Sequence, residues 1–248
     1  DAALEVYHFL WLKFCDWYVE FVKSDLTNNE RRTIVQAVLC HVLDTVLRLL
    51  HPFIPFVTEE LWQKIKKIKE HSESIMISKY PIYDNELVFK EELEKIEILT
   101  KVISGIRNIK INYNILLKTE LDAIFEIHDE SLKNLLKSNE SYIKTLAKTK
   151  DIIYTKEYQN LKEVGVNIIS NDLKVIVPLS SIVDITKERQ KLEKKLIELN
   201  NKIEKLKLKL ENEDFLKNAP IDIVEETRQK YEEFKDLKIK YEEMLQYL

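Results

Sequence analysis

Glycine is nearly absent from this chain, because only two glycines and five prolines occur in 248 residues. Hairpins and tight loops usually need glycine, so the shortage argues against a fold built mainly from short strands. Hydrophobic residues make up 45% of the sequence and charged residues 33%, which provides enough apolar side chains for a core. The composition therefore predicts a mainly α protein of one large or two smaller domains.

Cysteine is scarce as well. Cys15 and Cys40 each lie in a helical apolar pattern, and neither belongs to a CxxC pair or to a His/Cys cluster with zinc-ligand spacing. This pattern favours two buried, reduced thiols in a cytoplasmic protein. No apolar run approaches the roughly 20 residues of a membrane span, and no signal peptide is recognised. We therefore expect no membrane partner and no metal site.

Neither sign of charge dominates the sequence. A net charge of −4 and a pI near 5.9 exclude a globally basic nucleic-acid binder, but they allow a local basic face. The sequence has no glycine-rich phosphate loop, and no trio of nucleophile, base and orienting group stands out. A hydrolase using His8 or His128 with a serine has no motif behind it. We therefore expect no catalytic residue and no cofactor-binding residue in this chain.

The first part of the chain has the period of amphipathic helices. From Val6 to Val22 the apolar residues, many of them aromatic, recur every three or four positions, which predicts one buried helix face. A polar break at Thr27–Asn29 can cap a second helix. The apolar stripe of that second helix is expected to face the core, with its histidine as a satisfied core residue; the stripe consists of Ile34, Val38, His41, Val42, Val46 and Leu49.

A stretch with two prolines, LHPFIPFVTEELWQ from Leu50 to Gln63, follows the second helix. Pro52 and Pro55 lack a backbone donor and disfavour helix in the residues before them, which predicts an extended turn. Thr58 is the expected N-cap of a third helix, which should end near Glu70. The apolar residues of the turn are expected to be buried by packing from outside it; they are Phe53, Ile54 and Phe56.

Beyond a connecting loop at Ser72–Glu86, a long helix is predicted from Glu86 to Asn114. Its second half is basic, which makes Arg107 and Lys110 candidate phosphate contacts, although a solvated polar face explains the charges equally well. Between Glu120 and Ile185 the apolar period changes from 3.6 to 2, which predicts short strands. A hairpin turn at residues 170–172 and a helix at residues 131–148 complete a small α+β unit.

The last part of the chain has the clearest pattern. Leucine and isoleucine recur at alternating steps of four and three residues, first from Leu192 to Leu210, and a second seam runs from Val224 to Leu248. Pro220 cannot lie inside a helix, so the two seams should fold back as an antiparallel coiled-coil hairpin. From Lys187 to Leu210 nine basic residues oppose four glutamates, a net charge of +5 that RNA backbone can use.

Three stretches carry a resemblance to a known family. LHPFIPFVTEELWQ resembles a segment shared by the anticodon-binding domains of class I aminoacyl-tRNA synthetases for valine, isoleucine, leucine and methionine. FCDWYVE, Phe14–Glu20, resembles a segment of the valyl and isoleucyl enzymes. The tip of the predicted hairpin is similar to that of the tRNA-binding arm which ends valyl-tRNA synthetases; its matching residues are Asn212, Phe215, Ala219 and Pro220.

The resemblance implies a fold in three parts. Residues 1–85 would be part of a class I anticodon-binding helical bundle, residues 86–185 a long helix with the small α+β unit, and residues 186–248 the antiparallel coiled-coil arm. The sequence Met76-Ile77-Ser78-Lys79 superficially resembles the class I KMSKS loop, but the leading lysine is missing. The chain has no initiator methionine and opens directly in an amphipathic pattern, so we expect it to be a fragment of a longer enzyme.

The resemblance also implies a function. Valyl-tRNA synthetases attach valine to its tRNA with ATP and hydrolyse mischarged threonine, and this fragment would bind valine-specific tRNA at the anticodon stem and the elbow without catalysis. ATP would be used only by the full-length enzyme, and the fragment is expected to be a monomer. Five lysines are the implied candidates for tRNA contact: Lys205 and Lys230, flanked by Lys202, Lys209 and Lys235.

A protein-interaction module is the alternative function. Heptad hairpins commonly bind other proteins, and the basic seam helix could pair with an acidic partner or with a second copy of the chain. The mass in solution discriminates these interpretations, because a self-associating coil forms dimers whereas a tRNA-binding arm stays monomeric.

Overall fold

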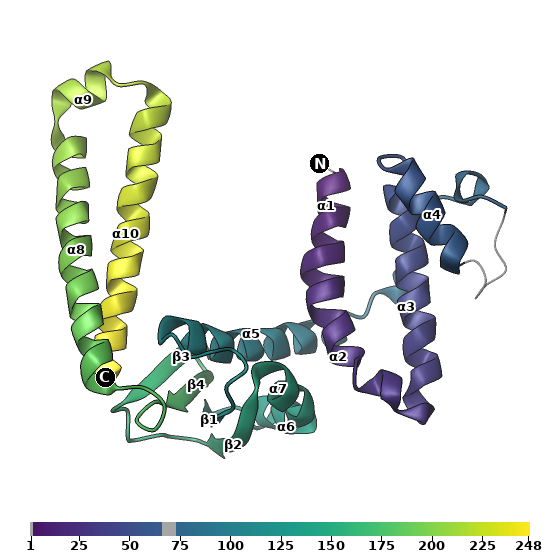
Figure 1. Ribbon diagram of the computed structural model, residues 1–248, viewed down its shortest axis with the longest axis horizontal. Coiled ribbons are helices and arrows are strands. Elements are labelled where there is room, and N and C mark those ends of the chain that lie inside the picture. The colour runs from purple at the N-terminus through teal and green to yellow at the C-terminus, as the bar shows by residue number, and fades with distance from the viewer. Residues whose placement is uncertain (1, 66–72) are drawn as a thin grey trace. The chain divides into compact units, whose positions relative to one another are not determined.

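The computed structural model describes residues 2–65 and 73–248. The chain forms two compact units, Asp1–Glu94 and Lys95–Leu248 (Figure 1). In the described residues of the first unit all regular elements are helical, whereas the second unit combines helices with a sheet. The predicted mainly α fold is therefore confirmed.

The first unit begins with one continuous helical segment. α1 (Ala2–His8) passes through a π-helical stretch (Phe9–Val19) into α2 (Glu20–Val22). After a 3₁₀ turn (Asp25–Thr27), the side chain of Asn28 accepts the backbone N–H of Glu30 at 3.0 Å and caps α3 (Asn29–Leu50). This cap confirms the predicted polar break.

α4 (Pro55–Ile65) begins earlier than predicted. Proline suits the first turn of a helix because it has no N–H to leave unpaired. Thr58 therefore lies inside α4 instead of capping it, and its buried hydroxyl donates to the carbonyl of Ile54 at 2.9 Å. The predicted burial of the turn is also wrong, since Phe53, Ile54 and Phe56 are exposed, Phe56 to 89%. The predicted helix end near Glu70 lies outside the described residues.

The core of the first unit is built around Trp62 of α4, whose side chain is fully buried. Leu47 of α3 and Ile75 pack against it. The indole Nε1 of Trp62 donates to Asp44 Oδ1 at 2.9 Å, and Arg48 pairs with Asp44 Oδ2 at 2.7 Å. Because a buried carboxylate is costly without such partners, these two contacts explain how α3 and α4 pack around an aspartate.

The stripe of α3 that was predicted to be core is only partly buried. Val46 is buried as predicted, together with Val35, Leu47 and Leu50. Ile34, Val38 and His41 are exposed, and Val38 and His41 line an apolar groove of about 940 Å³ beside Phe9 and the loop at residues 83–89. The prediction of His41 as a core histidine is therefore wrong. α3 is apolar on more than one face, so its periodicity alone does not identify the buried one.

α3 also corrects the expectation that no apolar segment approaches the length of a membrane span. Among the described helices, Glu30–Leu50 is the one long and apolar enough to cross a membrane, with a mean hydropathy of 1.6 over its most apolar 18 residues. The core helix of a globular protein satisfies the same test, so length and composition alone do not establish a span.

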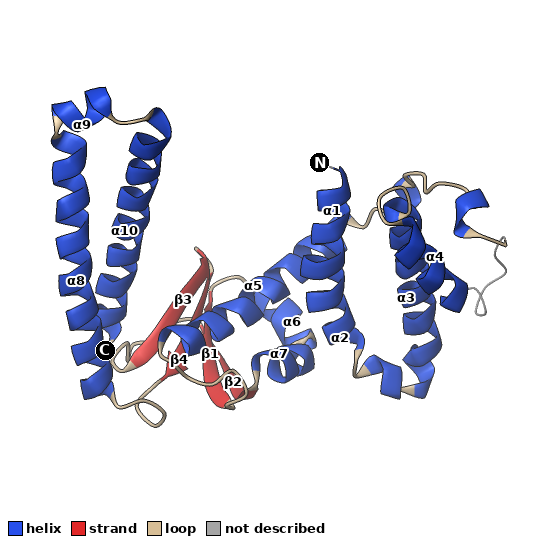
Figure 2. Cartoon of the chain, turned by 45° about the horizontal axis from the view of Figure 1, so that its top comes forward, coloured by secondary structure: helices blue, strands red, loops and turns tan. Residues whose placement is uncertain are grey.

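The second unit is organised on a four-stranded mixed sheet with the strand order β2-β1-β4-β3 (Figure 2). β1 runs parallel to β2 and antiparallel to β4, and β3 pairs antiparallel with β4. α6 (Glu130–Ser138) and α7 (Glu140–Ala147) connect the two parallel strands. This confirms the predicted α+β unit; the strands are β1 (Leu121–Ile127), β2 (Thr149–Thr155), β3 (Val164–Ser170) and β4 (Leu173–Pro178).

α5 (Lys90–Asn112) crosses this sheet, and both glycines of the chain lie at the crossing. A Cβ atom on Gly165 of β3 would lie 2.4 Å from Ile109 Cγ2, and one on Gly105 of α5 would lie 2.9 Å from Ile169 Cδ1. Real Cβ atoms do not approach other atoms so closely at core packing density. The two glycines thus allow a helix and a strand to approach each other closely, and neither of them forms a turn.

The last three helices form a hairpin (Figures 1 and 2). α8 (Ile185–Glu211) and α10 (Ile221–Tyr247) lie side by side in opposite directions, with α9 (Glu213–Asn218) between them at the tip. At about 1.5 Å per residue each long helix extends roughly 40 Å. The predicted break before Pro220 is confirmed, although part of it is the short helix α9.

The hairpin ends on the sheet. Tyr247 of α10 packs against a cluster of Ile124, Val164 and Ile176. Because successive strand residues point to opposite faces, Val164 and Gly165 face opposite ways, and the end of α10 therefore covers the face that α5 does not. The base of the hairpin is part of the core of the second unit.

Candidate nucleic-acid interface

Lysines of α8 lie over aromatic rings of α10 along one edge of the hairpin. Lys195 Nζ is 5.6 Å from the ring centre of Tyr241, and Lys202 Nζ is 5.9 Å from that of Phe234. Both lysines and both rings are seven residues apart, so the same contact repeats along the heptad. A cation at about this distance from a ring face is attracted by the ring quadrupole. Each ammonium group thus lies over a ring of the opposite helix, while both lysines remain exposed.

The tip pattern has a structural role as well as a family resemblance. Asn212 Oδ1 accepts the backbone N–H groups of Asp214 at 2.9 Å and Phe215 at 3.2 Å, and so caps α9. The ring of Phe215 lies 4.7 Å from Lys209 Nζ. At the other end of α9 the N–H of Ala219 donates to the carbonyl of Phe215 at 3.0 Å. The tip therefore positions a third lysine, seven residues beyond Lys202, against a ring.

The two candidate lysines of α10 are paired with glutamates of their own helix. Lys230 pairs with Glu226, and Lys235 Nζ lies 3.0 Å from Glu232 Oε2. The hydrogen bond from Lys230 lowers the pKa of Glu226, and the nearby charge of Lys209 lowers it further. Lys209, Lys230 and Glu226 thus form one mixed-charge cluster near the tip.

Lys205 is exposed on α8. The contacts of Lys195 with Tyr241 and of Lys202 with Phe234 set the register of the two helices, which puts residue 205 level with residue 231. The predicted proximity of Lys205 and Lys230 along the hairpin fits this register. Whether these lysines bind RNA stays a prediction.

Lys110 is not a surface residue. Its side chain is fully buried, and Nζ donates to four backbone carbonyls: those of Thr119 at 2.6 Å, Ala147 at 2.7 Å, Lys148 at 3.0 Å and Leu117 at 3.3 Å. Burial, together with the nearby charge of Arg107, lowers the pKa of Lys110 to about 8. The ammonium joins the loop after α5 to the end of α7, so we no longer expect a phosphate contact from it.

Arg107 is half-buried and also serves the interior. Its Nε and Nη2 donate to the carbonyl of Leu146 at 3.2 Å and 2.9 Å, close to the C-terminal end of α7. A cation at this end of a helix complements the helix dipole. The basic second half of α5 therefore has a structural explanation, because Arg107 and Lys110 both bind carbonyl groups of the adjoining segment.

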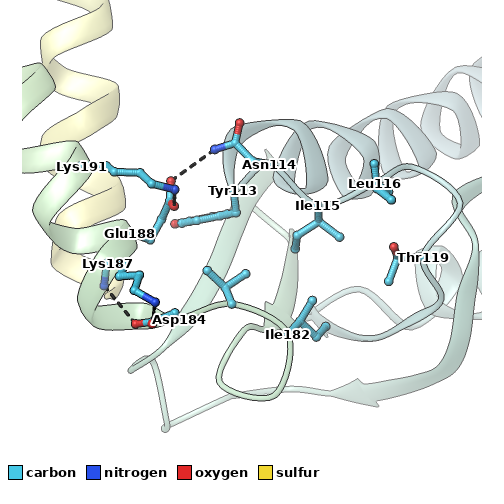
Figure 3. Close-up of a pocket in the computed structure, with 11 residues that line it drawn as sticks. Tyr113, Asn114, Ile115, Leu116, Thr119, Ile182, Asp184, Lys187, Glu188 and Lys191 are labelled. Atoms are coloured by element: carbon cyan, nitrogen blue, oxygen red, sulfur yellow. Dashed lines mark hydrogen bonds and ion pairs between the residues drawn. The ribbon is translucent and has the colours of Figure 1, made fainter.

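A pocket of about 450 Å³ lies at the base of the hairpin, between the end of α5 and the start of α8 (Figure 3). Glu188 of α8 is only 3% exposed; its Oε1 accepts from Asn114 Nδ2 at 3.4 Å and its Oε2 pairs with Lys191 at 2.9 Å. Tyr113 lies beside them, and burial, with the charge of Glu188, raises its pKa to about 12. This polar cluster anchors the hairpin to the α+β unit.

The sequence pointed to the basic face of the hairpin but missed two of its features. Lys195 was not among the candidates, although it precedes Lys202 by seven residues and the aromatic residues of the opposite seam repeat at the same spacing. Glu188 was missed because nothing local marks a glutamate as buried. In the described part of the chain no group of three or more His, Cys, Asp or Glu residues is placed to hold a metal ion.

Two family comparisons agree with this geometry. Residues 1–125 match the anticodon-binding domain of tRNA ligase, and residues 184–248 match the valyl tRNA synthetase tRNA binding arm. The first match covers half of the chain, and the chain belongs to the anticodon-binding domain family of tRNA ligases. Within that class, the second match identifies the helical hairpin with the arm of the valyl enzymes.

Three curated relatives of this chain are each named valine--tRNA ligase. The valine--tRNA ligase of Geobacter sulfurreducens is 36% identical over 235 residues, which are 94% of this chain and 26% of that protein. That of Fervidobacterium nodosum is 36% identical over 244 residues, 98% of this chain and 27% of the relative. That of Aquifex aeolicus is 33% identical over an alignment of 262 residues, which covers 100% of this chain and 22% of the relative. The chain thus spans about a quarter of the length of these relatives, and the matches do not favour the interaction-module alternative.

Proposed function

We propose that this chain is the tRNA-binding C-terminal portion of a valine–tRNA ligase. The observation that carries the proposal is the hairpin: its tip is built on Asn212 and Phe215, its edge presents lysines that lie over rings, and residues 184–248 match the tRNA binding arm. In the whole enzyme, ATP-dependent attachment of valine and editing would be carried out by other parts. No catalytic residue is assigned to this chain.

The two family matches suggest a different part of the tRNA for each part of the chain. The helices of the first unit would contact the anticodon stem, and the hairpin, which we propose to be an antiparallel coiled coil, would contact the elbow of the tRNA. Lysine offers a point charge rather than a flat hydrogen-bonding fork, so the hairpin would bind phosphates more than it reads bases. We also propose that the protein is cytoplasmic and monomeric.

A salt titration tests this function. Binding of the chain to valine tRNA and to an unrelated tRNA is measured from low to moderate salt. Tight, salt-dependent binding supports the proposal, because each neutralised phosphate adds about 0.7 to 0.9 to the slope of log affinity against log salt. A preference for valine tRNA would assign anticodon recognition to the chain, and equal binding would assign it backbone contacts only. No binding to either tRNA at low salt would contradict the proposal.

A further inference from the structure

The pocket at the base of the hairpin has a polar end and an apolar end (Figure 3). At the polar end lie the carboxylate of Glu188, the ammonium group of Lys191 and the ring of Tyr113. The apolar end is formed by side chains of the loops after α5 and before α8: Ile115, Leu116, Ile182 and Val183. Its volume of about 450 Å³ is in the range of small-molecule sites, which combine apolar walls with a few convergent polar groups.

Two polar groups of this pocket are buried and poorly satisfied. Tyr113 is 4% exposed, and within the described residues no hydrogen bond is found for its hydroxyl group. Glu188 is 3% exposed, and the hydrogen bond to its Oε1 comes from Asn114 Nδ2 at 3.4 Å, beyond the usual N–H···O range of about 2.7–3.2 Å. A buried polar group without a good partner costs free energy, so both groups favour a ligand that pairs with them.

The charges of the pocket restrict the kind of ligand. Glu188 pairs with Lys191 at 2.9 Å and Asp184 pairs with Lys187 at 3.0 Å, so the acids and the bases that line the pocket cancel. The buried carboxylate repels a simple anion, and the two ammonium groups repel a simple cation. A zwitterion avoids both costs, because its positive group can approach a carboxylate while its negative group approaches an ammonium.

We infer that this pocket binds a free α-amino acid with an apolar side chain. The ammonium group of the ligand pairs with Oε1 of Glu188, and its carboxylate pairs with Lys191 and accepts the hydroxyl proton of Tyr113. That hydroxyl stays protonated at neutral pH, because burial and the charge of Glu188 raise the pKa of Tyr113 to about 12. The apolar side chain lies on Leu116 and Ile182, which are exposed at the other end of the pocket.

The inference goes beyond tRNA binding and does not depend on it. The pocket lies between the end of α5 and the first turn of α8, so a bound amino acid adds contacts at the base of the hairpin. Valine is the first probe, because the curated relatives are named valine--tRNA ligase.

The first test measures the binding of small probes to the whole chain by NMR titration. Valine should bind with a Kd on the order of 1 mM, as suits a ligand with so few atoms. Isobutylamine lacks the carboxylate of valine, isovalerate lacks its ammonium group, and glycine lacks its apolar side chain. Each of these three probes should bind at least about tenfold more weakly than valine.

Two conservative variants locate the site. Tyr113→Phe keeps the ring that lies beside Gly165 and removes only the hydroxyl group, and Glu188→Gln keeps the size of the side chain but removes its charge. Each should weaken valine binding at least about fivefold. Glu188→Gln should also bind isovalerate more tightly than the unsubstituted chain does, because the repelling charge is gone. The matched controls Tyr231→Phe and Glu193→Gln lie outside the pocket and should bind valine as the unsubstituted chain does.

Three results would overturn the inference. Equal binding of valine and of one singly charged analogue would show that the pocket does not select a zwitterion. Unchanged valine affinity in both pocket variants, with thermal melting showing that they are folded, would place the bound amino acid elsewhere on the chain. The third is the absence of binding by valine and leucine at about 10 mM. No tRNA is present in these measurements, so their failure is distinguishable from failure of the proposed function, which the salt titration tests.

Discussion

Asn114 Nδ2 lies 3.4 Å from the buried carboxylate of Glu188, and this contact joins the end of α5 to the first turn of α8. Asn114 has a φ of 54°, in the left-handed region that asparagine tolerates better than most residues. The same carboxylate pairs with Lys191 at 2.9 Å. This polar cluster therefore holds the α8 side of the hairpin base, and Tyr247 holds the α10 side on the sheet.

Replacement of this carboxylate is expected to loosen the hairpin at its base. Glu188→Ala leaves Asn114 and Lys191 without their shared acceptor, which should cost about 1–3 kcal/mol of stability. The orientation of the hairpin can be followed by electron-spin distances between labels on Leu216 and Lys150, in a background with Cys15 and Cys40 replaced by serine. The distance distribution should broaden in the variant. The exposed Glu193→Ala is the control, and equal broadening in both would contradict this role of Glu188.

The buried ammonium of Lys110 should be essential to the second unit. Lys110→Met fills a similar volume but leaves four carbonyl groups without their common donor. We expect a loss of at least about 3 kcal/mol in the free energy of unfolding, because each unsatisfied buried group costs about 1–3 kcal/mol. Urea denaturation measures it, with the exposed Lys101→Met on the same helix as the control. A loss below about 1 kcal/mol would show that the carbonyls find other partners.

Acid should destabilise the second unit through Glu126. Its pKa is lowered: burial acts to raise it, but the hydrogen bond from Lys174 at 2.7 Å and that from the backbone N–H of Tyr158 at 3.0 Å outweigh burial. A carboxyl with a lowered folded pKa stabilises the native state above its unfolded pKa of about 4.3. That contribution is lost as the pH falls through the folded pKa.

The expected signature is a decline in stability below about pH 4.5 that Glu126→Gln reduces. At neutral pH the same variant should lose about 1–3 kcal/mol, because two hydrogen bonds to a charged acceptor are weakened. Thermal unfolding between pH 3 and pH 7 provides the measurement, and Glu157→Gln, an exposed glutamate nearby, is the control. If the profile of Glu126→Gln parallels that of the unsubstituted chain, the assignment is wrong.

The two glycines should respond differently to alanine. At Gly165 a Cβ would meet Ile109 Cγ2 at 2.4 Å and the ring of Tyr113 at 3.0 Å, so helix and strand must move apart, at about 1–3 kcal/mol. At Gly105 the nearest atom is the flexible end of Ile169, and alanine gains up to about 1 kcal/mol in helix propensity. Melting of the two single variants should rank Gly165→Ala as the less stable. The reverse order would show that the crossing adjusts more easily than its packing suggests.

The sequence predicted the helices and strands better than it predicted which of their residues are buried. The two long C-terminal helices, the four short strands and the cap at Asn28 follow from patterns within a few residues, and the structure has each of them. The start of α4 was misplaced because proline both ends a preceding segment and suits the first turn of the next helix. His41 was misplaced because α3 is apolar on more than one face.

Among the candidate site residues, the basic face of α8 was predictable, since a charge excess on an amphipathic helix is visible in the sequence. The fate of Arg107 and Lys110 was not, because the acceptor of Arg107 and two of the four acceptors of Lys110 lie nearly 40 residues further along the chain, at the end of α7. The difference between Lys195, held by a ring, and Lys187, held by a carboxylate, was equally invisible in composition.

The sequence by itself determined the secondary structure, the family resemblance and the place of the charge, because periodicity, caps and tip residues act over one or two helical turns. Only the tertiary structure decided which apolar face of α3 is buried, which basic residues serve the interior and which lysines lie over rings. These properties depend on contacts between segments far apart in the chain. The physical reason is that desolvation and hydrogen-bond pairing are set by the partner segment, which a local pattern does not contain.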